Sequence, residues 1–550
     1  MKKNTAKKML SICFAATLAS TALAGCGGKK KDGEQYLEVY VLHKGYGISW
    51  VEPLLDAFKQ QAWVQEKYPE LEVDWDSDDS NATAFNKMAH GENYNTTDII
   101  FGEALETFSG AKSGKIANLT ESVYNSAVPG ENGITVGEKM IDGIRENSKY
   151  GVESWEENVY YVYPYRAGTS GIIYNATLLN NLDLEVPLTT TQFVETLEAV
   201  SNTNNNIYSE GYAIAENAKD GYWAKQFNVW WAQYSGINQF SDFYYGLVGN
   251  TQSPDVFKDT GRLKSLEVFE SIFRPNKVEG DYKYDASKAT YRYIYPYANE
   301  ASTDYMVAQN GFLAGKGIFH ANGDWFETEM HTYREGFKQQ GYDYEFKFMR
   351  TPIISSIIET LPENSVADDM ELRALVKAID AGNTALEGTG YSVEQADYDR
   401  VKAARCIVVN SGGTAIIPSY ASAKGVAIDL LRFMATDVAQ EAMIKSSYGL
   451  TLPFKYNMND NPALNSYIAD THKSKLEIFA STTLPMVALP SSSQFPYDIT
   501  EFYHYDMEVT TLEALFSAGK KTAVGIYNEE IDYWKTMGTK WQQMISGGNV

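Results

Sequence analysis

The stretch Tyr161–Asn175, YVYPYRAGTSGIIYN, joins two short apolar runs that each have the composition of a buried strand. The runs are Val159–Tyr163 and Ile172–Tyr174, and between them lie Tyr165, Arg166, Gly168, Thr169 and Gly171. A guanidinium is costly to bury unless it is paired and hydrogen-bonded. The sequence therefore predicts that this junction faces a ligand or a hinge and is not ordinary core.

The first residues have the form of a secretory signal. A basic start, MKKNTAKK, precedes an apolar run from Met9 to Ala24, which as a helix would rise ~24 Å and fall short of the ~30 Å hydrocarbon core of a membrane. The Leu-Ala-Gly before Cys26 resembles the lipobox of bacterial lipoproteins, which implies that Cys26 is acylated, for example with palmitate. We expect a lipoprotein signal peptide at 1–25, a flexible tether at 26–35, and a chain anchored on the extracellular face of the cell membrane.

Composition excludes several classes of protein. The chain has 550 residues, enough for two or more domains, and a formal net charge of −24, which would be repelled by nucleic acid and by anionic membrane surfaces. No nucleic-acid partner is expected. Of the three cysteines, only Cys406 would remain free after processing, so no disulfide framework is possible.

The first third of the mature chain alternates between strand and helix patterns. Runs typical of strands occur at Tyr36–Leu42, Leu71–Trp75 and Thr97–Phe101, with helical patterns near Trp50–Trp63 and at Asn81–His90. This alternation predicts an α/β fold with a mainly parallel sheet.

Further along, capping signals and apolar stripes predict a helix after Thr189 and a pair of helices, one at Lys424–Ala435 and one beginning at Asp437. The polar, glycine-rich segment 121–155 is expected to be a surface excursion, and the charged segment 355–405 to be an insertion.

Motifs of catalysis and metal binding are absent from the sequence. It has no G-x-S-x-G elbow and no P-loop, because neither Gly114-Lys115 nor Gly315-Lys316 is followed by Ser or Thr. The six histidines are scattered without metal-ligand spacing, so we expect neither a metal nor another cofactor. Among 71 acidic residues some carboxylate pair always suits a glycosidase, so a secreted carbohydrate-active enzyme remains an alternative.

Four segments in order resemble the extracellular solute-binding protein family 1, the maltose-binding-protein-like lipoproteins of carbohydrate ABC transporters. They are Tyr163-Pro164 with Ile173-Tyr174-Asn175, then Phe312–Gly317 with His320–Trp325, then Gly412–Ile416 with the helix pair after it, and Tyr448–Pro453.

The resemblance implies a two-lobed periplasmic-binding-protein-like fold of type II, with mainly parallel sheets flanked by helices and several chain crossings at the hinge. The first lobe would comprise 36–165 and 411–475, and the second 166–410 and 476–550. The two apolar runs around Arg166 would then be strands in different lobes. One continuous buried strand at this place would contradict that arrangement.

Candidate ligand-binding residues are predicted on three grounds. Some lie on the junction around Arg166, where the chain would cross between the lobes. Others follow the ends of strands, where open α/β sheets bind ligands, and one matches the position of the family's stacking tryptophan. We expect Trp325 to stack on a sugar, and one of the adjacent Trp230 and Trp231 to face the cleft while the other is core. The complete set is Tyr46, Trp50, Glu103, Tyr165, Arg166, Thr169, Trp230, Trp231, Asn322, Asp324 and Trp325.

The function that the resemblance implies is the capture of a carbohydrate, with an oligosaccharide favoured by the many aromatic residues, and its delivery to membrane permease subunits. The protein would act as a monomer and would not be an enzyme. Besides an enzyme, the same fold binding a peptide, a polyamine, a metal or another small polar solute remains open.

Overall fold

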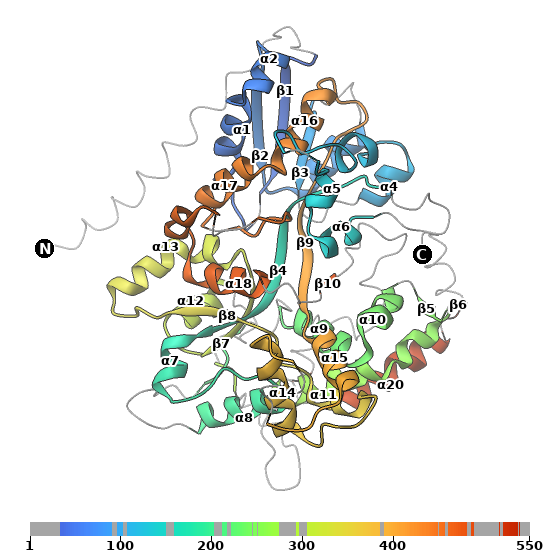
Figure 1. Cartoon of the computed structure of the whole chain (residues 1–550), viewed down its shortest axis with the longest axis vertical. Helices are drawn as coiled ribbons and strands as arrows, with labels where there is room; N and C mark the ends of the chain where they lie inside the picture. The colour runs from blue at the N-terminus through green and yellow to red at the C-terminus, as the bar shows by residue number, and fades with distance from the viewer. Residues whose placement is uncertain are drawn as a thin grey trace, which may run out of the picture.

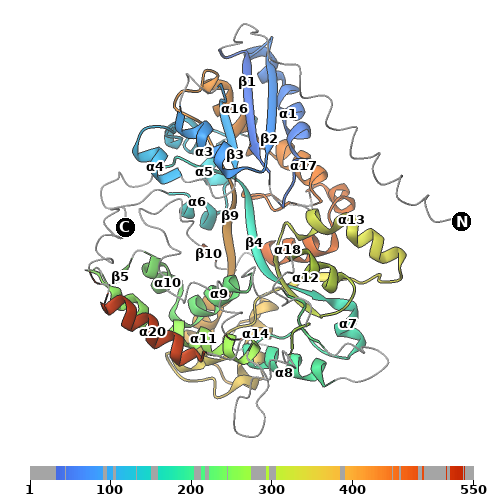
Figure 2. The ribbon, with the colours of Figure 1, turned by 180° about the vertical axis from the view of Figure 1, so that it is seen from behind.

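Two long antiparallel strands run side by side through the middle of the molecule. In the computed structural model, β4 (Tyr163–Asn175) pairs with β9 (Ile407–Ile416) over most of its length. Figure 1 shows one group of elements above this pair and a second group below it, and Figure 2 shows the same division from behind.

The structure describes residues 33–43, 45–90, 96–102, 107–131, 133–149, 159–202, 212–216, 222–244, 246–249, 251–273, 293–295, 305–384, 390–448, 450–456, 460–480, 486–488, 516, 521–536 and 538. The other strands are β1 (Tyr36–Leu42), β2 (Glu72–Asp78), β3 (Ile99–Gly102), β5 (Leu247–Val248), β6 (Thr251–Gln252), β7 (Phe319–Gly323), β8 (Phe346–Met349) and β10 (Met486–Ala488). The α-helices are α1 (Val51–Lys59), α2 (Ala62–Lys67), α3 (Asn81–His90), α4 (Thr107–Lys112), α5 (Val136–Lys139), α6 (Asp142–Asn147), α7 (Ala176–Asn181), α8 (Thr190–Ser201), α9 (Ala224–Ser235), α10 (Ile237–Tyr244), α11 (Thr260–Phe273), α12 (Tyr305–Leu313), α13 (Phe326–Gln339), α14 (Asp369–Asp380), α15 (Gln395–Ala404), α16 (Lys424–Met434), α17 (Asp437–Ser446), α18 (Asp470–Ala480) and α20 (Ala523–Thr536). Short helical turns are η1 (Thr120–Tyr124), η2 (Pro254–Lys258), η5 (Ser355–Thr360) and η7 (Pro462–Ser466).

The first lobe is built on the parallel strands β2, β1 and β3, in that order, with β9 antiparallel beside β3. Successive side chains of a strand point to opposite faces, and here each face carries its own core. Val39 and Val41 of β1 join the cluster that contains α1 and α16, whereas Tyr40 and Leu42 join the smaller cluster that contains Met88 of α3. Because β1 is buried on both faces, apolar residues occupy almost all of its positions and do not merely alternate with polar ones.

The second lobe uses the other halves of the same two long strands. There β4 pairs with β7 and β8, both antiparallel, and β9 pairs with β10 in parallel. Ile172 joins a large core with helices α8, α9, α11, α14, α15 and α20, while the next residue, Ile173, joins a smaller core with α12 and α13. Helices therefore cover both faces here as well.

The break that the sequence predicted around Arg166 is not present. Residues Tyr163–Asn175 form one continuous, almost fully buried strand, with irregular pairing to β9 on either side of Arg166. Two lobes nevertheless exist, because a strand of this length spans ~43 Å and enters both cores. It sends Tyr163, Tyr165 and Ala167 into the core of the first lobe and Ile172 into that of the second. The predicted boundaries at 165/166 and 410/411 thus fall inside paired strands.

The segment expected to be a surface excursion and the segment expected to be an insertion both contribute residues to the cores. Within 121–155, the described residues include Tyr124, Val136 and Met140, all buried in the core of the first lobe. Within 355–405, α14 and α15 bury Leu375 and Val401 in the core of the second lobe. Their polar composition reflects the outward faces of short helices, which the sequence alone does not separate from loops.

The locally encoded elements agree with the sequence. The first strand has the predicted bounds, as has α3, and α17 begins at Asp437 as expected. Thr189 caps α8 by accepting a hydrogen bond from the backbone N–H of Gln192. The Gln192 side chain accepts from Leu188 N–H, one residue before the capping position, so a capping box between Thr189 and Gln192 is only half formed.

Candidate functional site between the lobes

The predicted candidates on β4 meet the loop after β1 and the turn between β7 and α13 at the junction of the two lobes. We call this group the interlobe site. It comprises Tyr46, Trp50, Tyr165, Arg166, Thr169, Tyr222, Lys225, Asp324, Trp325, His472 and Lys475. The two lobes thus touch through polar and aromatic side chains at the place where the sequence predicted a ligand.

Aromatic rings and one guanidinium form a continuous stack across the junction. The Trp50 ring lies 5.1 Å from that of Tyr165 at an interplanar angle of 31°. The Arg166 guanidinium carbon lies 3.5 Å from the centre of the Tyr46 ring, and Tyr46 meets Trp325 edge to face at 5.8 Å. Cation–π attraction helps to hold Arg166 although its side chain is almost fully buried. This contact is one reason why a charged residue can be buried in β4.

Asp324 connects four segments of the chain. Its carboxylate accepts a hydrogen bond from the Tyr46 hydroxyl of the first lobe, and its other oxygen lies 3.4 Å from Lys475 Nζ on α18. Its backbone N–H donates to the carbonyl of Thr169 on β4 at 3.0 Å, and its own carbonyl lies 2.8 Å from His472 Nε2. Asp324 therefore joins the loop after β1, β4 and α18 to the start of α13.

Burial strongly perturbs the two basic residues that α18 contributes. Burial lowers the pKa of His472 to about 3, with a further contribution from Lys475, whereas contacts of its two ring nitrogens with the carbonyls of Asp324 and Tyr448 act in the opposite direction. A neutral imidazole can donate to only one of these carbonyls. Burial also lowers the pKa of Lys475 to about 8, and the Asp324 carboxylate limits that decrease.

Trp325 is only partly buried and has neighbours from both lobes. Besides Tyr46, its ring lies 5.9 Å from Tyr222, and Lys225 Nζ lies 4.5 Å from the ring centre. Lys225 also donates to Ser170 Oγ at 2.9 Å. A Cβ on Gly323 would lie within 2.0–2.3 Å of the indole, so only glycine allows Trp325 to fold back over this turn.

Several buried polar atoms at the junction have no hydrogen-bond partner among the described residues. They include the indole nitrogen of Trp50 and the hydroxyls of Thr169 and Thr451. Thr451 adjoins β4, because its carbonyl accepts from the backbone N–H of Ala167. Unpaired donors and acceptors of this kind cost free energy when buried, and a polyhydroxylated ligand can satisfy them.

Three predicted site residues have a different role from the expected one. Trp230 and Trp231 both lie on α9 with no exposed surface, one against Phe269 and the other against Phe243, so the expected division into one core and one cleft residue is wrong. Both belong to the core because α9 has apolar neighbours on more than one side.

Asn322 is the third of these residues, since its amide contacts His320 Nε2 at 2.8 Å and the backbone N–H of Gly323 at 2.7 Å. Its polar atoms stabilise the end of β7. Glu103, also predicted, lies outside the described residues.

Sequence reasoning missed Tyr222, Lys225, Thr451, His472 and Lys475. Thr451 lies within the family-like segment Tyr448–Pro453 but was not singled out there, and the other four belong to no recognisable motif. His472 and Lys475 lie on a helix that follows the family-like segments. Their positions depend on the return of the chain across the junction after η7. Over the part of the chain that the structure describes, no group of His, Cys, Asp or Glu side chains is arranged to hold a metal ion.

Comparison with known proteins relates the fold to one class. No protein-family model and no curated protein matches the sequence. Among solved structures, a family 1 extracellular solute-binding protein from Bifidobacterium longum subsp. infantis superposes with a TM-score of 0.51 at 15% identity, covering 92% of this chain and 100% of that one.

Two other similar structures point to the same class. The GacH receptor of Streptomyces glaucescens, solved unliganded and with acarbose, gives 0.52 at 14% identity over 91% of this chain and 97% of that one. An ABC substrate-binding protein from Listeria monocytogenes in complex with cycloalternan gives 0.52 at 11% identity over 92% and 99%.

These similarities confirm the predicted fold, which is the two-lobed α/β fold of extracellular solute-binding proteins. No helix among the described residues is long and apolar enough to cross a membrane.

Proposed function

We propose that the protein is a lipid-anchored, extracellular solute-binding protein that captures a carbohydrate between its lobes and delivers it to the permease of an ABC importer. The observation that carries the proposal is the interlobe site, where Trp325, Tyr46 and Trp50 lie beside buried polar groups that lack partners. A sugar ring offers C–H faces to aromatic rings and hydroxyls to polar side chains. The site contains both kinds of partner.

The proposed mechanism is closure of the lobes about the two long strands. Boundaries at 165/166, 410/411 and 475/476 would place the bending points in β4, in β9 and within α18. Contacts from Tyr46 and His472 to Asp324 would hold the closed form, while a sugar takes up the polar groups of Trp50 and Thr169. We expect the ligand to be an oligosaccharide, because several aromatic rings lie in series across the junction.

Anchoring rests on the first residues. In this proposal residues 1–25 direct export, Cys26 carries the lipid, and residues 26–35 hold the soluble body near a membrane permease. Cys26→Ser should abolish incorporation of radiolabelled palmitate and release the protein into the medium. Labelling that survives this change would contradict the assignment of Cys26.

The sugar assignment is tested by thermal shift and calorimetry of the protein without residues 1–26 against mono- and oligosaccharides. We expect saturable binding without release of any product, and at least tenfold weaker binding in Trp325→Ala. Trp63→Ala is a matched control, because Trp63 packs against Phe58 in the first lobe, away from the junction. If no sugar binds while peptides or polyamines do, the carbohydrate assignment fails. Product release that depends on one carboxylate would identify an enzyme.

A further inference from the structure

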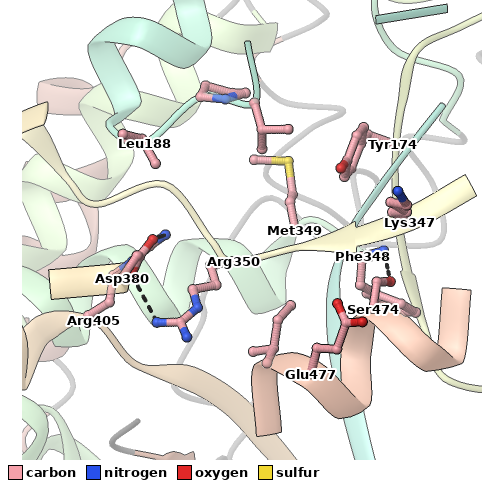
Figure 3. Close-up of a pocket in the computed structure, with 13 residues that line it drawn as sticks. Tyr174, Leu188, Lys347, Phe348, Met349, Arg350, Asp380, Arg405, Ser474 and Glu477 are labelled. Atoms are coloured by element: carbon pink, nitrogen blue, oxygen red, sulfur yellow. Dashed lines mark hydrogen bonds and ion pairs between the residues drawn. The ribbon is translucent and has the colours of Figure 1, made fainter. Parts of the chain in front are cut away.

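A separate cavity of about 440 Å³ lies in the second lobe, between β8 and α18. Tyr174 of β4, the segment before α8, the end of α14 and Arg405, two residues before β9, complete its wall (Figure 3). It shares no residue with the interlobe site. Ligand pockets generally have volumes of about 300–1,000 Å³, so it is large enough for a small molecule.

One end of this cavity has an excess of positive charge. Arg405 binds the Asp380 carboxylate through two nitrogens, at 3.0 and 2.8 Å, and Arg350 Nη1 lies 2.9 Å from the same carboxylate. Two guanidinium groups thus share one carboxylate. No second acceptor is bonded to Arg350 among the described residues, whereas Arg405 also donates to the Thr351 carbonyl at 2.5 Å. Burial lowers the pKa of Arg350, which is the direction expected where the charge is incompletely compensated.

The other end has the opposite charge. Lys347 lies there with its ammonium 2.9 Å from Glu345, and the exposed Glu477 of α18 lines the same side. In the described part of the chain no cation approaches Glu477 closely enough to form an ion pair, although Lys347 lies near enough to act on it electrostatically. One cation therefore serves two carboxylates, the reverse of the arrangement at Arg350.

Apolar side chains occupy the wall between these two ends. Val186 and Leu188 line it from the segment before α8, Met349 from β8 and Ile478 from α18. In the view of Figure 3, Arg350 lies to the lower left of Met349 and Glu477 to its lower right. A ligand that complements the cavity would carry a negative group, an apolar body and a positive group in that order.

We propose that this cavity binds a small zwitterion, an amino acid or a longer amino-carboxylate, with its carboxylate at Arg350, its ammonium at Glu477 and its hydrocarbon part against Leu188 and Met349. Arginine is suited to the carboxylate because its planar group can donate two parallel hydrogen bonds. The ligand's carboxylate and that of Asp380 would together balance the two guanidinium groups of Arg350 and Arg405.

The test uses three probes of equal chain length on the purified full-length protein, measured by calorimetry. 6-Aminohexanoate carries both charges, hexanoate only the negative one and hexylamine only the positive one. We expect 6-aminohexanoate to bind at least tenfold more tightly than hexanoate, and hexylamine to bind most weakly. Equal binding of 6-aminohexanoate and hexanoate, or no binding of any probe, would overturn the proposal.

Variants assign the two charges separately. Arg350→Gln should weaken both carboxylate probes at least tenfold, and Arg350→Lys should restore part of the loss. Glu477→Gln should leave hexanoate unchanged and remove the advantage of 6-aminohexanoate; because Glu477 is exposed, this variant is available even if Arg350→Gln does not fold. Two controls should leave the affinities of the three probes unchanged: Lys473→Gln on α18, whose ammonium pairs with Asp470, and Trp325→Ala, which affects only the interlobe site. Probe binding that survives Arg350→Gln contradicts the assignment of the carboxylate to Arg350. Probe binding that is lost in Trp325→Ala contradicts a site separate from the interlobe site.

Discussion

Trp325 was predicted to stack on a sugar and one of the adjacent Trp230 and Trp231 to face the cleft, but the structure places them in different surroundings. The adjacent pair is wholly buried on α9, whereas Trp325 is partly buried at the turn between β7 and α13, with aromatic neighbours from both lobes. An aromatic side chain on the buried face of a helix stabilises the lobe to which that helix belongs. One at a turn between lobes is available to a ligand, and position decides which role a tryptophan takes.

The largest effect expected is on stability, from Trp231→Ala. Removing a fully buried tryptophan leaves a cavity beside Phe243 and should lower the free energy of unfolding by about 3–5 kcal/mol. Urea denaturation followed by circular dichroism measures it. If this variant is as stable as the unaltered protein and has lost sugar binding instead, Trp231 is a site residue and the distinction from Trp325 is wrong.

The next effect is the pH dependence of stability that His472 of the interlobe site should cause. Because the folded-state pKa of His472 is about 3, below the unfolded value of 6.5, the unfolded chain binds a proton first as the pH falls. Stability is then complete above about pH 6.5 and declines toward pH 3, by up to about 1.4 kcal/mol per pH unit. His472→Gln, which does not titrate, should show a flatter dependence between pH 6.5 and 4.5 in urea titrations. Identical slopes for both proteins would contradict this assignment.

Gly413→Ala should have a smaller effect, at the place where β9 approaches the stack. A Cβ there would lie 2.6 Å from Tyr165 Cζ and 2.7 Å from Arg166 Nε, so both side chains must move, at a cost of about 1–3 kcal/mol. Gly336→Ala is the matched control, because a Cβ in α13 meets nothing and alanine favours a helix. The control should be stabilised slightly in thermal unfolding; equal losses in the two variants would argue against close packing at Gly413.

The smallest stability change is expected for Trp325→Ala, about 1 kcal/mol, because its ring is only partly buried. Its loss should appear in sugar affinity instead, and Trp325→Phe should recover part of it through the remaining ring. Denaturation and calorimetry on the same preparation separate the two quantities. A stability loss as large as that of Trp231→Ala would place Trp325 in the core and remove the distinction.

Much of the fold followed from local sequence. A short, mostly apolar run gave the bounds of β1, and the side chain of Thr189 fixed the start of α8, since these signals act within a few residues. The candidate site was partly predictable, because Trp325, Arg166 and Tyr46 follow strands or lie on the crossing. The roles of His472 and Lys475 could not be predicted, since they face Asp324 only after α18 returns to the junction.

The sequence by itself determined the alternation of strands and helices and the concentration of polar residues around Arg166. Tertiary structure decided that this stretch is one strand and not two, because pairing with β9 continues past Arg166 despite its irregular register. It also decided that Arg166 lies over the Tyr46 ring and that Trp230 and Trp231 are core. The physical reason is that burial and pairing depend on contacts between residues far apart in the chain, and periodicity within one segment carries no information about its neighbours in space.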